Sequence, residues 1–117
     1  MNPDFLSPSS IIDIHTHPLQ RLADGTVFSP AESLALMLRS MDKAGITMSG
    51  LLGHNVDPLQ SAAEIRAVNA FTHEMVRLCP ERFFGFVFIN PELPSDLVAE
   101  ELDHWLVQPE FRAVKLE

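Results

Sequence analysis

Two histidines separated by one residue are the side chains most suited to chemistry in this sequence. His15 and His17 follow a short apolar run at residues 11–14, which predicts a buried β-strand. Side chains of a strand alternate between its two faces, so both imidazoles project from one face, together with Asp13. Neutral imidazoles bind divalent cations such as zinc, but a zinc site needs three or four ligands. The pair therefore predicts part of a metal site, and a chance His-x-His pair is the alternative interpretation.

Composition limits the classes of protein and of partner. The chain has 117 residues, 46% hydrophobic and 21% charged, which is typical of one globular domain of modest size. Its formal net charge of −8 disfavours nucleic acid and anionic membranes as partners. A single cysteine, Cys79, excludes an internal disulfide and fits a reducing compartment. With no signal-peptide pattern and no long apolar run, we expect a soluble, cytoplasmic protein.

Local signals predict three helices. The first begins at Ser29 as N-cap, with Pro30 at the first helical position and Glu32 completing a capping box, and it ends at Gly45. Asp57-Pro58 predicts the start of a second helix that ends at Pro80, and Ser95 is the expected cap of a third helix that ends before Pro109. The expected buried stripes are Leu34, Met37, Leu38 and Met41, then Ile65, Val68, Thr72, Met75 and Val76, then Val98, Leu102, Trp105 and Leu106.

Apolar runs at residues 46–52, 83–89 and 111–116 predict three further strands. Strands that alternate with helices at this spacing indicate βαβ units and a parallel sheet. Two architectures share the pattern, an open doubly wound sheet and a (β/α)8 barrel. Since a barrel typically takes about 250 residues, we expect this chain to be the first half of something longer.

Several segments resemble one known family. Residues 11–18, Ile-Ile-Asp-Ile-His-Thr-His-Pro, resemble the first-strand metal motif of the amidohydrolase superfamily. Residues 80–86, followed by Asn90-Pro91, resemble the third strand of its amidohydrolase-related branch, which includes aminocarboxymuconate-semialdehyde decarboxylase. Residues 100–102 and 111–116 fit the helix and fourth strand that follow there. The resemblance implies a TIM-barrel-type (β/α)8 fold of the metal-dependent hydrolases, with residues 1–117 forming the N-terminal portion of one domain.

The resemblance also implies a function. Members of the family hold a divalent metal, usually zinc, and the ligand role carries over to His15 and His17. The other ligands, histidines of the fifth and sixth strands and an aspartate of the eighth, have no counterpart in this chain, so we expect the chain alone to be inactive. The implied reaction is hydrolysis of an amide, ester or lactone-like carbonyl of a small molecule by a metal-activated water. Decarboxylation within the same branch is the alternative.

Other polar residues fall where a barrel places its active-site loops. Arg21 can hold a substrate carboxylate, although a solvated loop arginine is the preferred interpretation. His54 follows the second predicted strand and can contact the substrate or be an ordinary loop histidine. Asn90 can contact substrate or cap a turn. Lys115 matches the position of a lysine that bridges two metals in binuclear relatives, but a structural or substrate-contacting lysine is the preferred interpretation. Asp13 can orient an imidazole or satisfy local hydrogen bonds.

Two competing interpretations remain open. A half-barrel without catalysis would expose two unpaired strand edges, which favour pairing with another copy or a complementary half. A doubly wound binding domain would carry a glycine-rich phosphate loop after its first strand, and His-Pro-Leu-Gln there contains no glycine. Whether the full-length protein forms a homo-oligomer is left open. His73 and His104 fall off the apolar helix stripes and are expected to face solvent.

Overall fold

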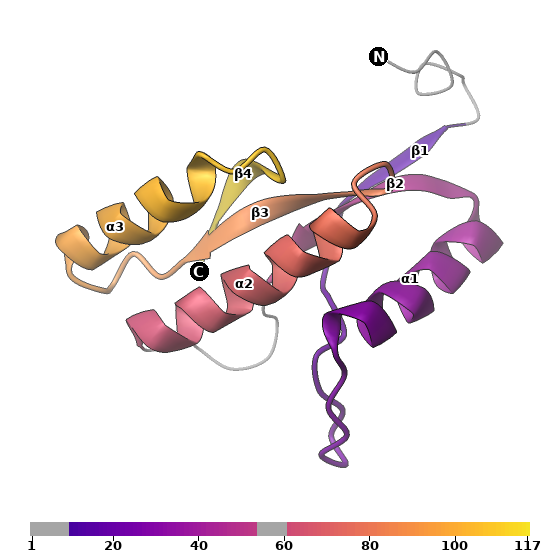
Figure 1. Ribbon diagram of the computed structural model, residues 1–117, viewed down its shortest axis with the longest axis horizontal. Helices are drawn as coiled ribbons and strands as arrows, with labels where there is room; N and C mark the ends of the chain where they lie inside the picture. Colours follow the sequence, from indigo (N-terminus) through magenta and orange to yellow (C-terminus); the bar gives the residue numbers. More distant parts are fainter. Residues whose placement is uncertain (1–9, 54–60) are drawn as a thin grey trace.

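Strands and helices alternate along the chain as predicted (Figure 1). The computed structural model describes residues 10–53 and 61–117. In order, the elements are β1 (Ile11–Thr16), α1 (Pro30–Ala44), β2 (Ile46–Leu52), α2 (Ala62–Leu78), β3 (Phe83–Ile89), α3 (Ser95–Leu106) and β4 (Phe111–Leu116). The bounds of β2, β3 and β4 match the predicted strands. None of the helices in the described segments is long and apolar enough to cross a membrane.

The strand order decides between the two architectures. The four strands form one parallel sheet in the order β1-β2-β3-β4. Each helix crosses over to the next strand in the same direction, and because such crossovers are right-handed, α1, α2 and α3 lie on one face of the sheet (Figure 1). A doubly wound sheet reverses its strand order and carries helices on both faces. The arrangement is therefore α/β and fits half of a TIM barrel.

Helix α1 begins as its sequence predicts. The Ser29 side chain accepts a hydrogen bond from the Glu32 backbone N–H at 3.1 Å, and the Glu32 carboxylate accepts one from the Ser29 N–H at 3.2 Å. This capping box satisfies two backbone donors that the first helical turn leaves without partners. At the other end Gly45 has φ 73°, the left-handed conformation that glycine adopts without a steric penalty.

The other two helices begin differently from the prediction. Helix α2 starts at Ala62, with Ser61 accepting a hydrogen bond from the Glu64 N–H at 3.1 Å, whereas the predicted Asp57-Pro58 start lies outside the described residues. Ser61 and Glu64 have the same capping spacing as Ser29 and Glu32 at the start of α1, so the sequence also carries a local signal for this start. The prediction that Ser95 caps α3 is wrong, because Pro94 is the N-cap and no side chain supplies a capping bond.

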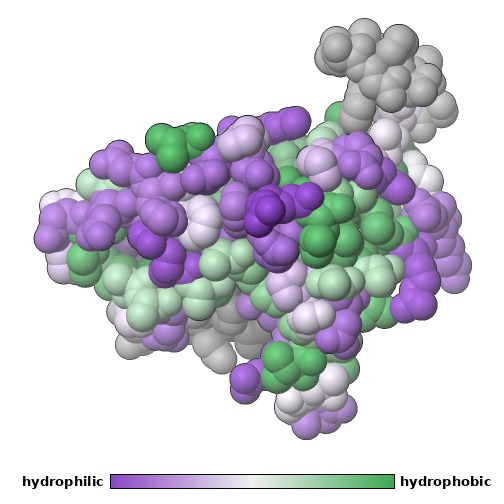
Figure 2. Space-filling model, in the orientation of Figure 1, coloured by the Kyte–Doolittle hydropathy of each residue, from purple (hydrophilic) through white to green (hydrophobic). Residues whose placement is uncertain are grey.

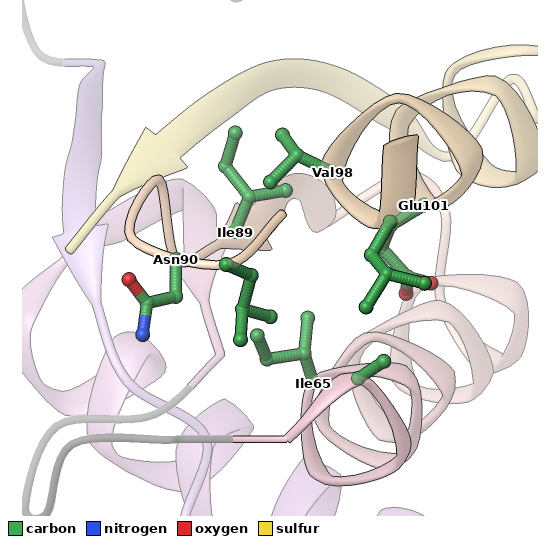
Figure 3. A pocket seen from close by; sticks show the side chains of 8 residues that line it. Ile65, Ile89, Asn90, Val98 and Glu101 are labelled. Carbon is green, nitrogen blue, oxygen red and sulfur yellow. The ribbon is translucent and has the colours of Figure 1, made fainter. Parts of the chain in front are cut away.

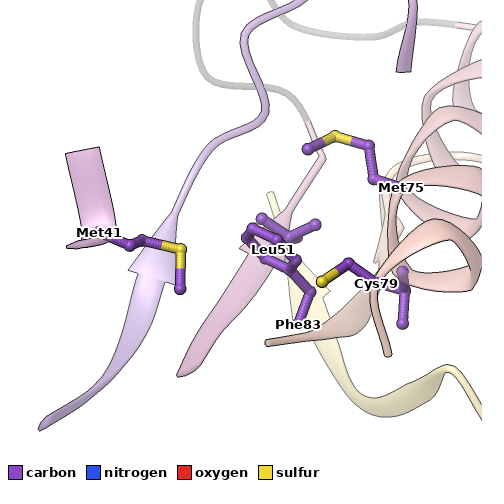
Figure 4. Close-up of a cluster of buried hydrophobic side chains, with 6 residues drawn as sticks. Met41, Leu51, Met75, Cys79 and Phe83 are labelled. Carbon is purple, nitrogen blue, oxygen red and sulfur yellow. The ribbon is translucent and has the colours of Figure 1, made fainter. Parts of the chain in front are cut away.

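The core lies between the helices and the two central strands. One buried cluster joins Met41 of α1, Met75 of α2, and Leu51 and Phe83 of β2 and β3, with Cys79 beside them (Figure 4). The predicted α2 stripe is confirmed, since all five of its members are buried. Seen from the helix side, the surface over α2 and α3 is mostly hydrophilic, and hydrophobic residues gather between α2 and α1 (Figure 2).

A second buried cluster fixes α3 against the sheet. Trp105 packs with Val87, Ile89 and Phe111. The prediction that Leu106 belongs to the same stripe is wrong, because its side chain is 46% exposed. Successive helical residues are rotated by about 100°, so the residue after Trp105 turns away from the sheet.

Strand β1 is exposed, contrary to the prediction of a buried strand. Ile11, Ile12 and Ile14 are all exposed, and Ile14 is 64% accessible. The reason is topological, because β1 pairs only with β2 and no other described element covers its far edge. Strand β4 is the opposite edge, and there Val114 and Leu116 are exposed as well.

Candidate metal centre

The two candidate ligands lie next to each other at the end of β1. The ring centroids of His15 and His17 are 5.1 Å apart, and the ring planes meet at 76°. His15 is exposed and His17 is partly buried. The structure therefore brings both imidazoles to one place at the carboxyl end of the sheet, which is the end that carries the active site in barrel enzymes.

One hydrogen bond determines which nitrogen of His17 is free. Its Nδ1 lies 2.9 Å from the carbonyl oxygen of Leu52, the last residue of β2. A carbonyl oxygen can only accept, so Nδ1 carries the hydrogen and Nε2 of the neutral ring keeps its lone pair. Histidines that bind metals typically show this arrangement, in which the second nitrogen donates to a carbonyl or carboxylate and fixes the ring. His17 is thus oriented as a ligand through Nε2.

The backbone around the histidines is held by three further hydrogen bonds. The Thr16 hydroxyl donates to the Gly50 carbonyl at 2.8 Å, and the Gln20 amide donates to the Gly53 carbonyl at 3.1 Å. Asp13 accepts from the backbone N–H of His15 at 3.0 Å, so its described contact is with the main chain and not with an imidazole. The Thr16 and Gln20 bonds tie the histidine segment to β2, and the Gln20 bond lies beyond the last β1–β2 pair, Thr16 with Leu51.

The remaining candidates are spread over several segments. Arg21 is exposed in a hairpin, where it pairs antiparallel with Val27. Lys115 lies partly buried on the edge strand β4, opposite Phe88 of β3. His54 lies outside the described residues. Among the described residues, no hydrogen bond or ion pair joins Arg21 or Lys115 to the histidine pair, and their site roles stay predictions.

Asn90 occupies the turn after β3. Its side-chain oxygen accepts a hydrogen bond from the Glu92 N–H at 2.9 Å, which is the turn-capping contact expected of asparagine. It also borders a small pocket between the starts of α2 and α3 (Figure 3). That pocket has about 10 Å³ of free space, enough for one water molecule and too little for a substrate.

A histidine expected to face solvent is instead packed. The His73 side chain is only 19% exposed, and its Nε2 lies 3.2 Å from a carboxylate oxygen of Glu110. Its ring stacks on Phe111 at 5.9 Å and also lies against Trp105. The prediction is wrong because these partners come from α3 and from the start of β4, and helical periodicity carries no signal of them. Glu110 precedes β4, so this pair is at the opposite end of the sheet from the metal candidates.

The donor set fits part of a metal site. Within residues 10–53 and 61–117, no group of three or more histidine, cysteine, aspartate or glutamate side chains comes together. Two imidazoles, one of them with its ring fixed, are consistent with zinc, which binds nitrogen ligands, and leave one or two protein ligands to be supplied. The chemistry of these residues is therefore compatible with a divalent cation, and the described residues alone do not complete its coordination.

Comparisons with known proteins give a similarity of fold. No protein-family model matches this sequence, and no curated protein matches it. Among solved structures, the crystal structure of 4-oxalomesaconate hydratase, LigJ, from Rhodopseudomonas palustris is similar, with a TM-score of 0.67 and 16% identity. The match covers 89% of this chain and 40% of the hydratase chain. At this identity the likeness shows the fold alone, an α/β arrangement that corresponds to less than half of the hydratase chain.

Proposed function

We propose that this chain supplies the first two metal ligands of a metal-dependent hydrolase of the amidohydrolase type. The observation that carries the proposal is the His17 ring, which donates from Nδ1 to the Leu52 carbonyl and leaves Nε2 available beside His15. The reaction class comes from the sequence resemblance. The similarity in fold to 4-oxalomesaconate hydratase supports a catalytic use of such a fold.

Each residue of the segment has a distinct part in this proposal. His15 and His17 hold the cation, and Asp13 and Thr16 keep the backbone between them in place through the bonds to the His15 N–H and the Gly50 carbonyl. When bound, a divalent cation lowers the pKa of a water molecule toward neutrality and polarises a carbonyl oxygen. The substrate is a small molecule with an amide, ester or lactone-like carbonyl. Arg21 is the proposed contact for a substrate carboxylate.

Zinc content tests the proposal directly. The intact protein, which includes the remaining ligands, is loaded with zinc, dialysed, and analysed by inductively coupled plasma mass spectrometry. We expect zinc at a fixed ratio to protein, and we expect the double variant His15→Ala/His17→Ala to lose it. His104→Ala is the matched control, since His104 is an exposed histidine on α3, and it should keep its zinc. Equal zinc in the double variant and the control would refute the metal role.

The reaction class needs a separate assay. Because the chain alone is expected to be inactive, zinc-loaded protein that also carries the remaining ligands is offered ester, amide and lactone substrates, and a parallel sample is offered unsaturated carboxylic acids. Hydrolysis products that disappear in the double histidine variant support the hydrolase proposal. Release of CO2 in the second sample, with no hydrolysis in the first, would favour the decarboxylase alternative.

A further inference from the structure

The segment after β1 places one polar side chain against the end of β2. Gln20 follows His17 by three residues, and its side-chain amide donates a hydrogen bond to the Gly53 carbonyl at 3.1 Å. The preceding carbonyl, that of Leu52, accepts the bond from His17 Nδ1 at 2.9 Å. Two consecutive carbonyls at the end of β2 therefore take one side-chain donor each from the segment that carries the candidate ligands.

These two carbonyls mark a change of direction in the backbone. In a regular strand, successive carbonyls point to opposite neighbours. The Gly50 and Leu52 carbonyls both accept bonds from the β1 side, as this alternation requires. The Gly53 carbonyl would then point toward β3, yet it accepts from Gln20 on the same side as Leu52. The chain therefore bends at Gly53, directly after β2, and the Gln20 amide holds this bend.

The bend also lies close against α2. A Cβ at Gly53 would overlap the Val68 side chain, so a residue larger than glycine could not approach the helix in this way. Val68 is buried in a hydrophobic cluster, which leaves it little room to move aside. The backbone at Gly53 is thus held by a packed helix and by the Gln20 amide.

The backbone of Gln20 is itself held in place. Its carbonyl accepts a hydrogen bond from the Phe28 N–H at 2.9 Å, which closes the hairpin between β1 and α1 (Figure 1). The N–H of the preceding residue, Leu19, donates to the Ser33 hydroxyl at 2.9 Å, and Ser33 is fully buried near the start of α1. A side chain that extends from a fixed backbone is preorganised for its partner.

We propose that Gln20 is a positioning residue of the metal centre. By holding the bend at Gly53, it keeps the Leu52 carbonyl where His17 Nδ1 donates to it, and the ring stays in the tautomer that leaves Nε2 for the cation. Without this contact the Leu52 carbonyl can shift, and the neutral ring can carry its hydrogen on either nitrogen. The role in metal binding rests on the proposed function, whereas the control of the His17 tautomer does not.

The tautomer of His17 can be measured without any metal. In the metal-free intact protein at pH 8, long-range proton–nitrogen correlation spectra distinguish the two ring nitrogens, and His17→Ala identifies the signals of this ring. The parent protein should carry the hydrogen on Nδ1. Gln20→Met keeps nearly the length of the side chain and removes the donor, so it should give a mixture of both tautomers. Gln108→Met is the matched control, since Gln108 is also partly buried but precedes β4 at the opposite end of the sheet.

Zinc affinity measures the consequence for the site. Competition with a chromogenic chelator should give a zinc dissociation constant about threefold to tenfold higher for Gln20→Met than for the parent or for Gln108→Met. The expected change is smaller than the loss of about 10–100-fold that is typical for a group bonded directly to a ligand, because Gln20 acts through the backbone of Leu52. Circular dichroism confirms that each variant is folded.

A second variant keeps the test decisive if Gln20→Met does not fold. Gln20→Glu retains the shape of the side chain and replaces its donor with an acceptor, so it should release the His17 ring in the same way. Hydrogen on Nε2 in the parent, an unchanged tautomer in both Gln20 variants, an equal change in Gln108→Met, or a zinc affinity that does not follow the tautomer would overturn the proposal. Absence of zinc from every sample would instead refute the proposed function, and the metal-free spectra would still decide whether Gln20 controls the ring.

Discussion

Strands β3 and β1 have opposite environments. Strand β3 lies between β2 and β4, beneath α2 and α3, and its Phe83 and Val87 are almost inaccessible. Among the described residues, strand β1 has one neighbouring strand and three exposed isoleucines, yet the histidine pair lies at its end. The tightly packed residues and the candidate metal ligands therefore lie on different strands of this sheet. Residues that stabilise β3 should govern folding, and residues of β1 should govern binding.

The end of β3 is held by a side chain in place of a strand. Asn69 of α2 donates to the Phe88 carbonyl at 2.9 Å and accepts from the Phe88 N–H at 2.8 Å. The carbonyl of the next residue, Ile89, accepts a hydrogen bond from the Glu117 N–H on the β4 side. Successive residues of a strand direct their backbone groups to opposite sides, so the N–H and C=O of Phe88 point toward β2. The pairing of β2 with β3 ends at Leu52. The Asn69 amide thus continues the strand pairing where β2 has left the sheet.

A buried carboxylate holds Asn69 in turn. Glu101 of α3 accepts hydrogen bonds from Asn69 at 3.0 Å, from Arg66 at 2.7 Å and from the Trp105 indole. Three donors around one carboxylate compensate for its burial. The network therefore joins α2, α3 and β3, and nothing comparable supports β1 among the described residues.

The largest expected effect comes from emptying the core at β3. Phe83→Ala should lower the free energy of unfolding by about 3–5 kcal/mol, because it removes a ring from a filled cluster and leaves a cavity. Ile14→Ala on β1 should cost less than about 1 kcal/mol, since its side chain is already exposed. Urea denaturation measures both. Similar losses for the two variants would mean that β1 is as well supported as β3.

A smaller effect is expected where hydrogen bonds are removed from β3. Asn69→Ala should cost about 2–3 kcal/mol, because the buried N–H and C=O of Phe88 and one oxygen of Glu101 lose a partner. Asn90→Ala is the matched control in the partly exposed turn after β3 and should cost less than about 1 kcal/mol. If the control costs as much as Asn69→Ala, the clamp on Phe88 has no special role.

Sequence reasoning succeeded where the cause is local. The α1 start at Ser29 and Pro30 and the stripe along α2 depend on residues within one or two turns, and the structure confirms them. It failed where the cause comes from another element. The exposure of β1 depends on whether a strand pairs with its far edge, and the burial of His73 depends on Phe111 in β4. The parallel sheet was predicted from alternation alone, whereas its one-sided arrangement required the strand order.

The candidate site was predicted only in part. The spacing of His15 and His17 indicated a shared face, and the structure places their rings together. The contact of His17 with the Leu52 carbonyl joins residues 35 apart in the chain, so no local pattern could reveal it. The roles proposed for Asp13, Arg21, His54, Asn90 and Lys115 remain predictions.

Two glycines lie on opposite faces of the sheet, Gly85 on the face covered by the helices and Gly50 on the other face. A Cβ at Gly85 would lie 2.8 Å from the Phe111 ring and 3.1 Å from Thr72, under the helices. A Cβ at Gly50 would meet the ring ends of Phe84 and Phe86, which are only partly buried and can move aside. Gly85→Ala should therefore cost about 1–3 kcal/mol, and Gly50→Ala should cost less. Thermal unfolding of both variants measures the difference, and equal losses would show that the second face is just as closed.

The smallest expected effect concerns Cys79, which reports on the core of β3. Burial, followed by a hydrogen bond to Glu81, raises the pKa of its thiol above the ordinary value. Because the pKa of the thiol is higher in the folded chain than in the unfolded chain, the neutral thiol contributes fully to folding stability below the unfolded pKa. That contribution declines as the pH rises through the folded pKa.

Alkylation of Cys79 by iodoacetamide should accordingly be slow in the folded chain at pH 8.5. Glu81→Gln removes the neighbouring charge and should accelerate it modestly, whereas Phe83→Ala should accelerate it more because it opens the cluster around the thiol. Ile14→Ala should leave the rate unchanged, and an increase there would show that opening of β1 also exposes the core.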